Sequence, residues 1–167
     1  MKEPVPDAES LLQALADQLR PAVTPRTALI GIYTGGVWVA KRLHDALGVK
    51  VPLGTIDIAF YRDDYSRRGL SSNVKPSDIR FDVADCDIVL VDDVLYTGRT
   101  IRAALNELFD YGRPGRVRLA ALVDRGGRQL PIEPQFVGAN VVVADDEQIL
   151  LKQAEDGRLS LQIERKT

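Results

Sequence analysis

The sequence predicts an α/β fold built around a mainly parallel sheet with helices on its faces. Three short apolar runs, at residues 28–33, 87–92 and 117–123, have the composition of fully buried strands. Helical patterns separate these runs, and each run ends in a polar or glycine-rich turn. Strands that alternate with helices in this way are typical of a parallel sheet, because each helix carries the chain back to the start of the next strand.

Two helices are predicted in the first third of the chain. One covers about residues 7–20, where Asp7 or Ser10 can provide the N-cap and leucines recur on one stripe. The other follows the glycine turn after the first strand and ends at Gly48, which favours the left-handed conformation of a helix C-terminus. Its predicted solvent face carries Lys41, Arg42 and His44. A lone histidine on such a face is expected to be structural rather than catalytic.

The rest of the chain is predicted to contain strands, one helix and one long connection. Residues 51–62 alternate like an extended segment, and residues 100–111 have the apolar spacing of a helix. Residues 63–78 have no periodicity and are long for a connection, so a mobile functional loop is expected there, with a hairpin extension as the alternative. Further short strands are expected at residues 136–143, 149–152 and 159–163.

Composition indicates one domain in the cytoplasm. The 167 residues suit a single domain, 1–167, and 45% hydrophobic residues are enough for a core. A net charge of -2 excludes a general nucleic-acid-binding surface, although a local basic patch stays open. The single cysteine, Cys86, has no disulfide partner within the chain, which fits a reducing compartment. No segment has the pattern of a signal peptide or the length of a membrane span.

Polar turns follow three of the predicted strands, at residues 34–36, 92–100 and 124–127. The carboxyl ends of parallel strands meet at one edge of a sheet, so these turns are expected to surround one cleft. The segment TGRT at 97–100 opens a helix and can offer backbone N–H groups and two hydroxyls to a phosphate. A plain threonine-capped helix would look the same over these four residues.

The acidic pair Asp92 and Asp93 directly precedes this turn and changes its interpretation. Two adjacent carboxylates at the end of an apolar strand are costly unless water, a metal or ligand hydroxyls meet them. A solvated turn explains the other pair, Asp145 and Asp146, but beside a phosphate-type turn a vicinal diol is the natural partner. Walker A, dinucleotide-binding and zinc-protease motifs do not occur in the sequence.

The segment VLVDDVLYTGRT at 89–100 resembles the signature with which type I phosphoribosyltransferases bind phosphoribosyl pyrophosphate (PRPP). Together with IDIAFYRDDYS at 56–66 and LVDRGGRQLP at 122–131, it resembles the bifunctional pyrimidine operon regulators that are also uracil phosphoribosyltransferases. The likeness runs from about residue 11 to residue 153. It implies the type I phosphoribosyltransferase fold, in which a small hood and a flexible loop accompany the central sheet.

The resemblance also implies which residues meet the substrates. Asp92 and Asp93 would position the ribose as catalytic residues. Separately, the positive charge of the 63–78 loop allows Arg67 and Arg68 to act with them by closing over the pyrophosphate, and a merely solvated flexible loop is the alternative. The residues implied for PRPP binding are Thr34, Gly35, Gly36, Asp92, Asp93, Val94, Leu95, Tyr96, Thr97, Gly98, Arg99 and Thr100. The residues implied on the base side are Arg125 and Val141.

The implied reaction converts uracil and PRPP to UMP and pyrophosphate. Magnesium would be carried by PRPP, with no metal ligand supplied directly by the protein. The resemblance further implies a homodimer or a higher homo-oligomer. A phosphoribosyltransferase for another base, purine or orotate, is the enzymatic alternative, because no residue pair by itself specifies uracil.

A second function is open beside the enzymatic one. The resembling family regulates pyrimidine biosynthesis genes in response to UMP or UTP by binding leader mRNA, which predicts a basic surface distinct from the catalytic cleft. Many RNA-binding relatives have Arg at the position of Gly35 and His at the position of Gly127. Two potential phosphate or base contacts are therefore missing, and use of the nucleotide site mainly as a sensor is the non-enzymatic alternative.

Overall fold

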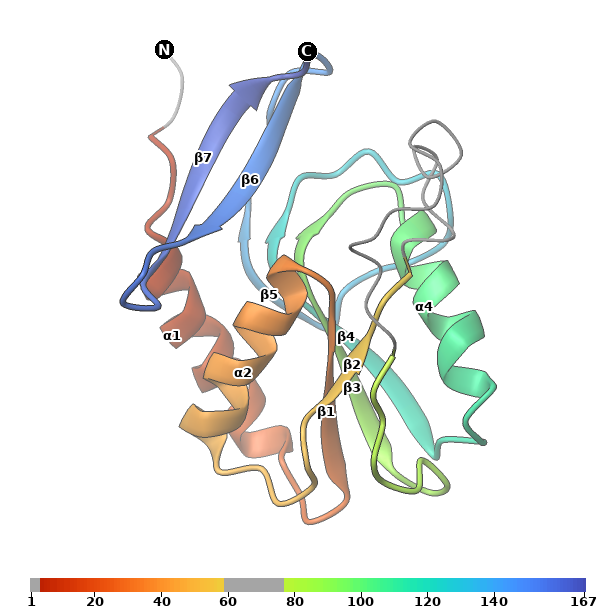
Figure 1. The fold of residues 1–167 in the computed structure, drawn as a ribbon. Helices are drawn as coiled ribbons and strands as arrows, with labels where there is room; N and C mark the ends of the chain where they lie inside the picture. Colours follow the sequence, from red (N-terminus) through yellow and green to blue (C-terminus); the bar gives the residue numbers. More distant parts are fainter. Residues whose placement is uncertain (1–3, 59–76) are drawn as a thin grey trace.

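The computed structural model describes residues 4–58 and 77–167 (Figure 1). Helices follow two of the buried strands, as the sequence predicts, and an antiparallel pair of strands comes last among the described elements. The elements are α1 (Ala8–Leu19), η1 (Arg20–Ala22), β1 (Thr27–Ile32), α2 (Gly35–Leu47), β2 (Gly54–Ile56), β3 (Asp87–Leu95), α4 (Arg99–Phe109), β4 (Arg116–Asp124), β5 (Phe136–Asn140), β6 (Glu147–Gln153) and β7 (Leu159–Arg165).

Five strands form one parallel sheet in the order β2-β1-β3-β4-β5. β3 lies in the middle and pairs with β1 on one side and β4 on the other. Since all five strands run the same way, the carboxyl ends of β1, β3 and β4 meet at one edge. The predicted parallel sheet is confirmed, and the three polar turns leave it at the same edge.

Helices cover both faces of this sheet, with α1 and α2 on one face and α4 on the other (Figure 1). Successive residues of β3 enter different core clusters: Val89 packs on the α1 and α2 side, whereas Leu90 packs on the α4 side. β1 divides its side chains in the same way at Leu29 and Ile30. This period of two explains why buried parallel strands read as unbroken apolar runs.

β6 and β7 form a separate antiparallel hairpin that packs on the α1 and α2 side of the molecule (Figure 1). Alternate residues of the hairpin, among them Leu151 and Leu161, enter the same core cluster as α1 and α2. The predicted strands at 149–152 and 159–163 are confirmed, and both extend beyond those bounds because the pairing continues from Glu147 to Arg165. The hairpin lies outside the parallel sheet and adds to the cover on its α1 and α2 side.

Several predicted boundaries differ from the structure. The strand predicted at 87–92 continues to Leu95, because Val94 still pairs with Val123 of β4. Within the described part of the extended segment predicted at 51–62, only Gly54–Ile56 pairs as a strand. His44 is also placed differently: it is half-buried, and its ring Nε2 forms a 2.8 Å hydrogen bond with the Val51 carbonyl. Its predicted structural role fits this bond, but its predicted solvent orientation is wrong.

Candidate functional site

The acidic pair lies at the carboxyl end of β3. Asp92 is buried, with 6% of its surface exposed, and Asp93 is half-buried. Each carboxylate accepts the N–H of the next residue: Asp93 N–H donates to Asp92 Oδ1 and Val94 N–H donates to Asp93 Oδ1, both at 2.9 Å. Such bonds help to stabilise carboxylates that are withdrawn from water. The pair therefore belongs to the end of a buried strand and differs from a solvated turn.

Glycines let the start of α2 approach this pair closely. A Cβ added at Gly36 would lie 2.5 Å from the Val91 carbonyl oxygen, and a Cβ added at Gly35 would collide with the Asp93 carboxylate. Thr34, the exposed N-cap residue, precedes both glycines. Close packing of the start of α2 against the end of β3 therefore requires glycine at both positions.

Gly98 begins α4 at the same edge of the sheet. Its φ of +92° lies in the left-handed region that favours glycine, and its carbonyl accepts the Arg102 N–H at 3.0 Å. The Arg99 N–H donates to Thr97 Oγ1 at 3.2 Å. The first N–H groups of a helix have no partner inside the helix, and a helix N-terminus carries about half a positive charge. The predicted phosphate turn thus has the backbone geometry of an anion site.

Two helix N-termini therefore flank one pair of carboxylates. α2 begins beside Asp93, and α4 begins six residues after it in the sequence. Each helix start can hold an anionic group, and the carboxylates between them can accept hydrogen bonds from hydroxyls. The arrangement suits a sugar that carries anionic groups at both ends.

The turn after β4 brings the predicted base-side residues to this edge. The Arg125 N–H donates to the Leu95 carbonyl at 3.0 Å, and the Arg125 guanidinium lies 3.9 Å from the centroid of the Tyr96 ring. Val141 follows β5, and its N–H donates to the Asp124 carbonyl at 2.9 Å. Arg125 and Val141 therefore lie at the same end of β4, next to the segment that joins the acidic pair to α4.

Some predicted residues do not present a side chain to the cleft. The Leu95 side chain is 2% exposed and belongs to the core cluster beneath α4, so only its backbone can take part in the site. Arg67 and Arg68, predicted to act from the long loop, lie outside the described residues. Their catalytic role stays a prediction, as does closure of that loop.

No role was predicted from the sequence for Arg128, although it lies in the segment LVDRGGRQLP at 122–131. Its guanidinium pairs with both oxygens of the Asp124 carboxylate, at 2.9 and 2.6 Å. Burial raises the pKa of Asp124, but hydrogen bonds from Arg128 and from the Gly126 N–H outweigh burial and leave that pKa below its ordinary value. The sequence did contain a signal for this ion pair, because Asp124 and Arg128 are four positions apart at the end of a buried strand. Lys166, whose Nζ lies 5.5 Å from the Tyr96 ring centroid, had no such signal.

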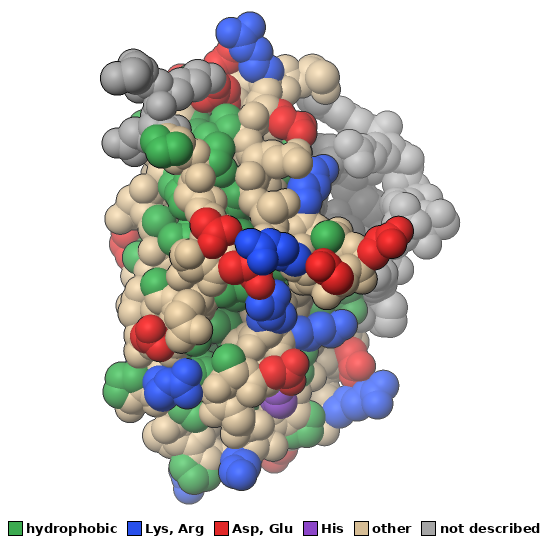
Figure 2. Space-filling view, turned by 90° about the vertical axis from the view of Figure 1, so that its left-hand side faces the viewer, with side chains coloured by type: hydrophobic (Ala, Val, Ile, Leu, Met, Phe, Trp, Pro, Cys, Tyr) green, Lys and Arg blue, Asp and Glu red, His purple; other side chains and the backbone are tan. Residues whose placement is uncertain are grey.

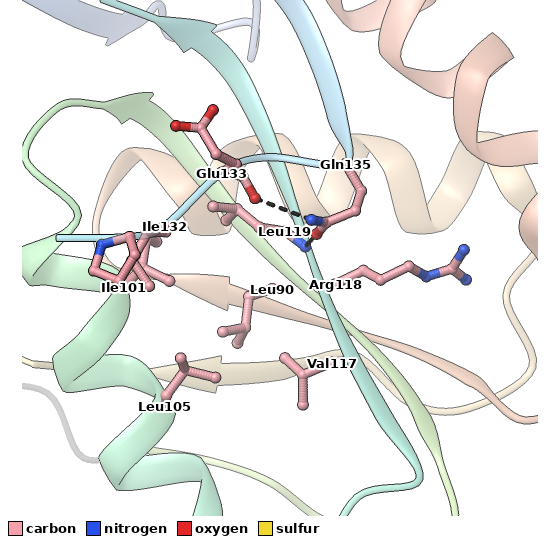
Figure 3. Close-up of a pocket in the computed structure, with 10 residues that line it drawn as sticks. Leu90, Ile101, Leu105, Val117, Arg118, Leu119, Ile132, Glu133 and Gln135 are labelled. Carbon is pink, nitrogen blue, oxygen red and sulfur yellow. Dashed lines mark hydrogen bonds between the residues drawn. The ribbon is translucent and has the colours of Figure 1, made fainter. Parts of the chain in front are cut away.

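A cavity of about 300 Å³ lies away from these strand ends, between α4, the middle of β3 and β4, and the segment leading to β5 (Figure 3). Its lining residues are Leu90, Ile101, Leu105, Val117, Arg118, Leu119, Pro131, Ile132, Glu133 and Gln135. There the Gln135 side chain accepts a 2.8 Å hydrogen bond from the Leu119 N–H and donates a 3.0 Å hydrogen bond to the Glu133 carbonyl (Figure 3). No predicted site residue lines this cavity, so it is separate from the candidate site.

The acidic pair fits a magnesium ion that enters with its substrate. Over residues 4–58 and 77–167, no three His, Cys, Asp or Glu side chains gather as a metal cage. Mg²⁺ usually keeps several waters and binds through one or two carboxylates together with substrate phosphates. Asp92 and Asp93 place negative charge at the strand end, and a magnesium ion carried by substrate phosphates would be attracted there without a direct protein ligand.

None of the helices that the structure describes is long and apolar enough to cross a membrane.

Comparisons with solved structures agree with this architecture. A hypoxanthine phosphoribosyltransferase from Trypanosoma cruzi superposes with a TM-score of 0.69 at 19% sequence identity, over 96% of this chain and 95% of that one. A hypoxanthine-guanine phosphoribosyltransferase from Bacillus anthracis superposes with a TM-score of 0.63 at 20% identity, over 88% of this chain and 87% of that one. At such low identity the likeness shows the fold, which is the type I phosphoribosyltransferase fold.

Sequence comparisons are more specific. The model of the phosphoribosyl transferase domain matches residues 6–149. The Bifunctional protein PyrR of Nitrosococcus oceani is 53% identical over 157 residues, which cover 93% of this chain and 86% of the relative. The protein of the same name from Pseudomonas paraeruginosa is 48% identical over 166 residues, or 97% and 95% of the two chains. The chain therefore belongs to the phosphoribosyl transferase domain family, in the branch whose members are named Bifunctional protein PyrR.

Proposed function

We propose that the chain is a uracil phosphoribosyltransferase, which converts uracil and PRPP to UMP and pyrophosphate. One observation carries the proposal: the N-termini of α2 and α4 flank the carboxylates of Asp92 and Asp93. PRPP has the same order of groups, with pyrophosphate at C1, the ribose hydroxyls beside it and a phosphate at C5. The order of anion sites and carboxylates in the protein therefore matches the order of charges and hydroxyls in the substrate.

The reaction breaks the bond between C1 and the pyrophosphate oxygen while a bond forms between C1 and N1 of uracil. Backbone N–H groups at residues 34–36 hold the leaving pyrophosphate, and Asp92 and Asp93 fix the ribose so that C1 faces the base. The N–H groups at the start of α4 hold the 5-phosphate. Magnesium bound to PRPP supplies positive charge that stabilises the departing pyrophosphate. The proton that uracil N1 loses passes to the departing pyrophosphate or to solvent, so no dedicated general base is required.

The choice of uracil rests on the sequence segments YRDDYS at 61–66 and DRGGRQLP at 124–131 and on the family branch. Backbone hydrogen bonds hold Arg125 and Val141 at the end of β4, and this position supports a role for both on the base side of the ribose. Arg125 is fixed by its Tyr96 contact and by a 3.0 Å bond from Nη1 to the Glu147 carbonyl. A rigid guanidinium of this kind can donate to a carbonyl oxygen of the base.

The test is turnover with a panel of bases. Purified protein is incubated with PRPP, magnesium and either uracil, orotate, hypoxanthine or adenine, and nucleotide and pyrophosphate are measured. We expect UMP and pyrophosphate in equal amounts with uracil. Nucleotide formation only with hypoxanthine or adenine would replace uracil by a purine, and absence of pyrophosphate with every base would reject the enzyme.

We also propose that the protein regulates pyrimidine gene expression by binding leader mRNA in response to UMP or UTP. The name of the relatives, Bifunctional protein, supports a second function. The face formed by α1, α2 and the hairpin intermingles acidic and basic side chains (Figure 2). There Arg42 is paired with Glu9 at 2.7 Å. A continuous basic surface for RNA is therefore to be sought on another face, and on a homodimer or larger assembly.

The RNA proposal is tested by titrating a pyrimidine leader RNA with the protein, with and without UMP, at several salt concentrations. Regulation predicts that UMP tightens binding to this RNA but not to a scrambled RNA of equal length. A response that depends on salt but not on UMP or RNA sequence would show nonspecific charge attraction. Light scattering on the same sample gives the oligomeric state.

A further inference from the structure

Arg128 joins three parts of the chain that meet beside the phosphate turn. It pairs with the Asp124 carboxylate at the end of β4, and its Nη1 donates to the Tyr96 carbonyl at 2.7 Å. Its Nε donates to the Ile132 carbonyl, also at 2.7 Å. Only 16% of the side chain is exposed. Four of the five N–H groups of the guanidinium thus donate hydrogen bonds, and its planar shape fixes the positions of the carboxylate and the two carbonyls that accept them.

Residues 129 and 130, which follow Arg128, also form hydrogen bonds with the turn before α4. The N–H groups of Gln129 and Leu130 donate to the Thr97 carbonyl, at 2.9 and 3.2 Å. The Gln129 side chain accepts a 2.8 Å bond from Arg99 Nε, in the first turn of α4. The carbonyls of Tyr96 and Thr97, together with the Arg99 side chain, are therefore all turned toward residues 128–130.

The orientation of these carbonyls decides where the following N–H groups point. In a planar trans peptide the C=O and the N–H point in opposite directions. With the Tyr96 and Thr97 carbonyls directed at residues 128–130, the N–H groups of Thr97 and Gly98 are directed away from that segment. These are the donors at the entrance to α4, where the proposed function puts the 5-phosphate.

We infer that Arg128 is a positioning residue for the 5-phosphate site. It does not touch the phosphate itself. It locks the turn after β4 against the Tyr96 and Thr97 carbonyls and thereby aims the N–H groups of the phosphate turn. The inference rests on the proposed function, because it assumes that this turn binds the phosphate of PRPP and UMP.

Lysine cannot replace arginine in this role. Its ammonium keeps the positive charge but lacks the planar fork that reaches a carboxylate and two carbonyls at once. The chain offers a matched control at the opposite end of the sheet, where Arg116 pairs with both oxygens of Asp87 at 3.1 and 2.8 Å. Arg116→Lys makes the same chemical change, far from the candidate site.

The experiment measures the dissociation constants of UMP and uridine by calorimetry for the full chain and for Arg128→Lys and Arg116→Lys. The two ligands differ only in the 5-phosphate, so their affinity ratio reports the phosphate site. We expect Arg128→Lys to weaken UMP about 10-fold to 100-fold while uridine changes less than about 3-fold. Arg116→Lys should leave both constants unchanged.

If Arg128→Lys binds UMP and uridine more weakly by the same factor, the variant is generally damaged and the inference is overturned. Unchanged dissociation constants for both ligands would also overturn it. If Arg128→Lys fails to fold, Asp124→Asn carries the same test, because it keeps the side-chain shape and an oxygen that can accept the Gly126 N–H, while it removes the negative charge that pairs with Arg128. A wild-type chain that binds UMP no better than uridine would reject the phosphate site itself. That result is distinct from a wild-type preference that survives in Arg128→Lys, which rejects the positioning role alone.

Discussion

Gly35 is one of the two positions at which the sequence is expected to differ from RNA-binding relatives, and its surroundings give a reason for glycine. The Asp93 carboxylate occupies the space where a Cβ would lie. An arginine at this position would therefore require Asp93 to move, in a strand end where the Val94 N–H already fixes that carboxylate. Glycine here keeps the start of α2 close to the acidic pair.

The acidic pair gives the first prediction. Asp92→Asn with Asp93→Asn should lower turnover of PRPP and uracil at least about 100-fold, because neutral amides attract the ribose hydroxyls and the magnesium of PRPP less strongly. UMP formation measures the loss. Thermal unfolding should remain cooperative, and the exposed pair Asp145 and Asp146, changed in the same way, is the control. Normal turnover in the first variant would reject the ribose assignment.

Two neighbouring glycines allow a second prediction at the residue scale. Gly126 and Gly127 both have positive φ, at +74° and +83°, but a Cβ meets nothing within 4 Å at Gly126 and lies 2.5 Å from Tyr96 Cε1 at Gly127. Gly126→Ala should lower the free energy of unfolding by about 1 kcal/mol through backbone strain alone. Gly127→Ala should lower it further and raise the KM for uracil, because the Tyr96 ring supports Arg125.

Urea unfolding and steady-state kinetics on the two alanine variants separate these effects. Equal stability losses in the two variants, with an unchanged KM for uracil, would mean that the Tyr96 ring moves aside at no cost in free energy. Gly127→His, the residue expected at this position in RNA-binding relatives, should behave like Gly127→Ala with a larger loss.

At the scale of the element, the two ends of β3 use aspartate in opposite ways. At the carboxyl end, Asp92 and Asp93 form the candidate site. At the other end, Asp87 is paired with Arg116 at 2.8 Å and Arg118 at 3.0 Å, and it contributes to the register between β3 and β4. The same strand is thus anchored by charge pairs at one end and carries the proposed ligand-binding groups at the other.

Asp87 gives a pH prediction. The hydrogen bond from Arg116 is the main reason why the pKa of Asp87 is lowered, and burial only partly opposes it. A carboxyl whose folded pKa is lowered stabilises the fold above its unfolded pKa, near 4, and this contribution is lost as the pH falls through the folded pKa. Asp87→Asn should therefore lower the free energy of unfolding by about 1–3 kcal/mol at pH 7 and by much less near pH 2.

Urea unfolding between pH 2 and pH 7 measures this difference. Asp110→Asn, at an exposed carboxylate just beyond α4, is the control and should leave the curve unchanged. A stability loss in Asp87→Asn that is the same at every pH would show that lost packing, and not the ion pairs, is responsible.

The predicted strand and helix order is correct because each element is specified by residues that are adjacent along the chain. β1 is an apolar run bounded by a glycine turn, and α2 ends where Gly48 takes a φ of +60°. The boundaries are less well predicted, since they depend on partners. β3 extends past Asp92 because β4 continues to pair with it, and no local pattern contains that information.

For the whole molecule, the central fact is that one sheet separates two apolar clusters. Leu15 lies in the cluster with α1 and α2, and Leu108 lies in the cluster with α4, both fully buried. Because β1 and β3 contribute alternate side chains to both clusters, neither can form without the sheet. This supports the prediction of a single domain.

The single-domain prediction is testable by unfolding. Trp38, the only tryptophan, packs against the α1 and α2 cluster, so its fluorescence reports that face, whereas far-UV circular dichroism reports all elements. Leu15→Ala and Leu108→Ala should each lower the free energy of unfolding by about 2–5 kcal/mol. In both variants the two signals should change at the same urea concentration. Separate transitions would show two independently folding parts.

The sequence by itself determined the α/β class, the order of the elements, the acidic pair and the phosphate turn, because each depends on neighbours in the chain. The tertiary structure alone decided that Gly35 meets Asp93 and that Arg128 reaches the Tyr96 carbonyl, contacts between residues 58 and 32 positions apart. Such contacts arise from strand order and from packing across the sheet edge, where distant segments compete for the same polar groups. Local patterns identify the groups that can bind a phosphate and a sugar. The fold determines which of them are brought together and held in the orientation that binding requires.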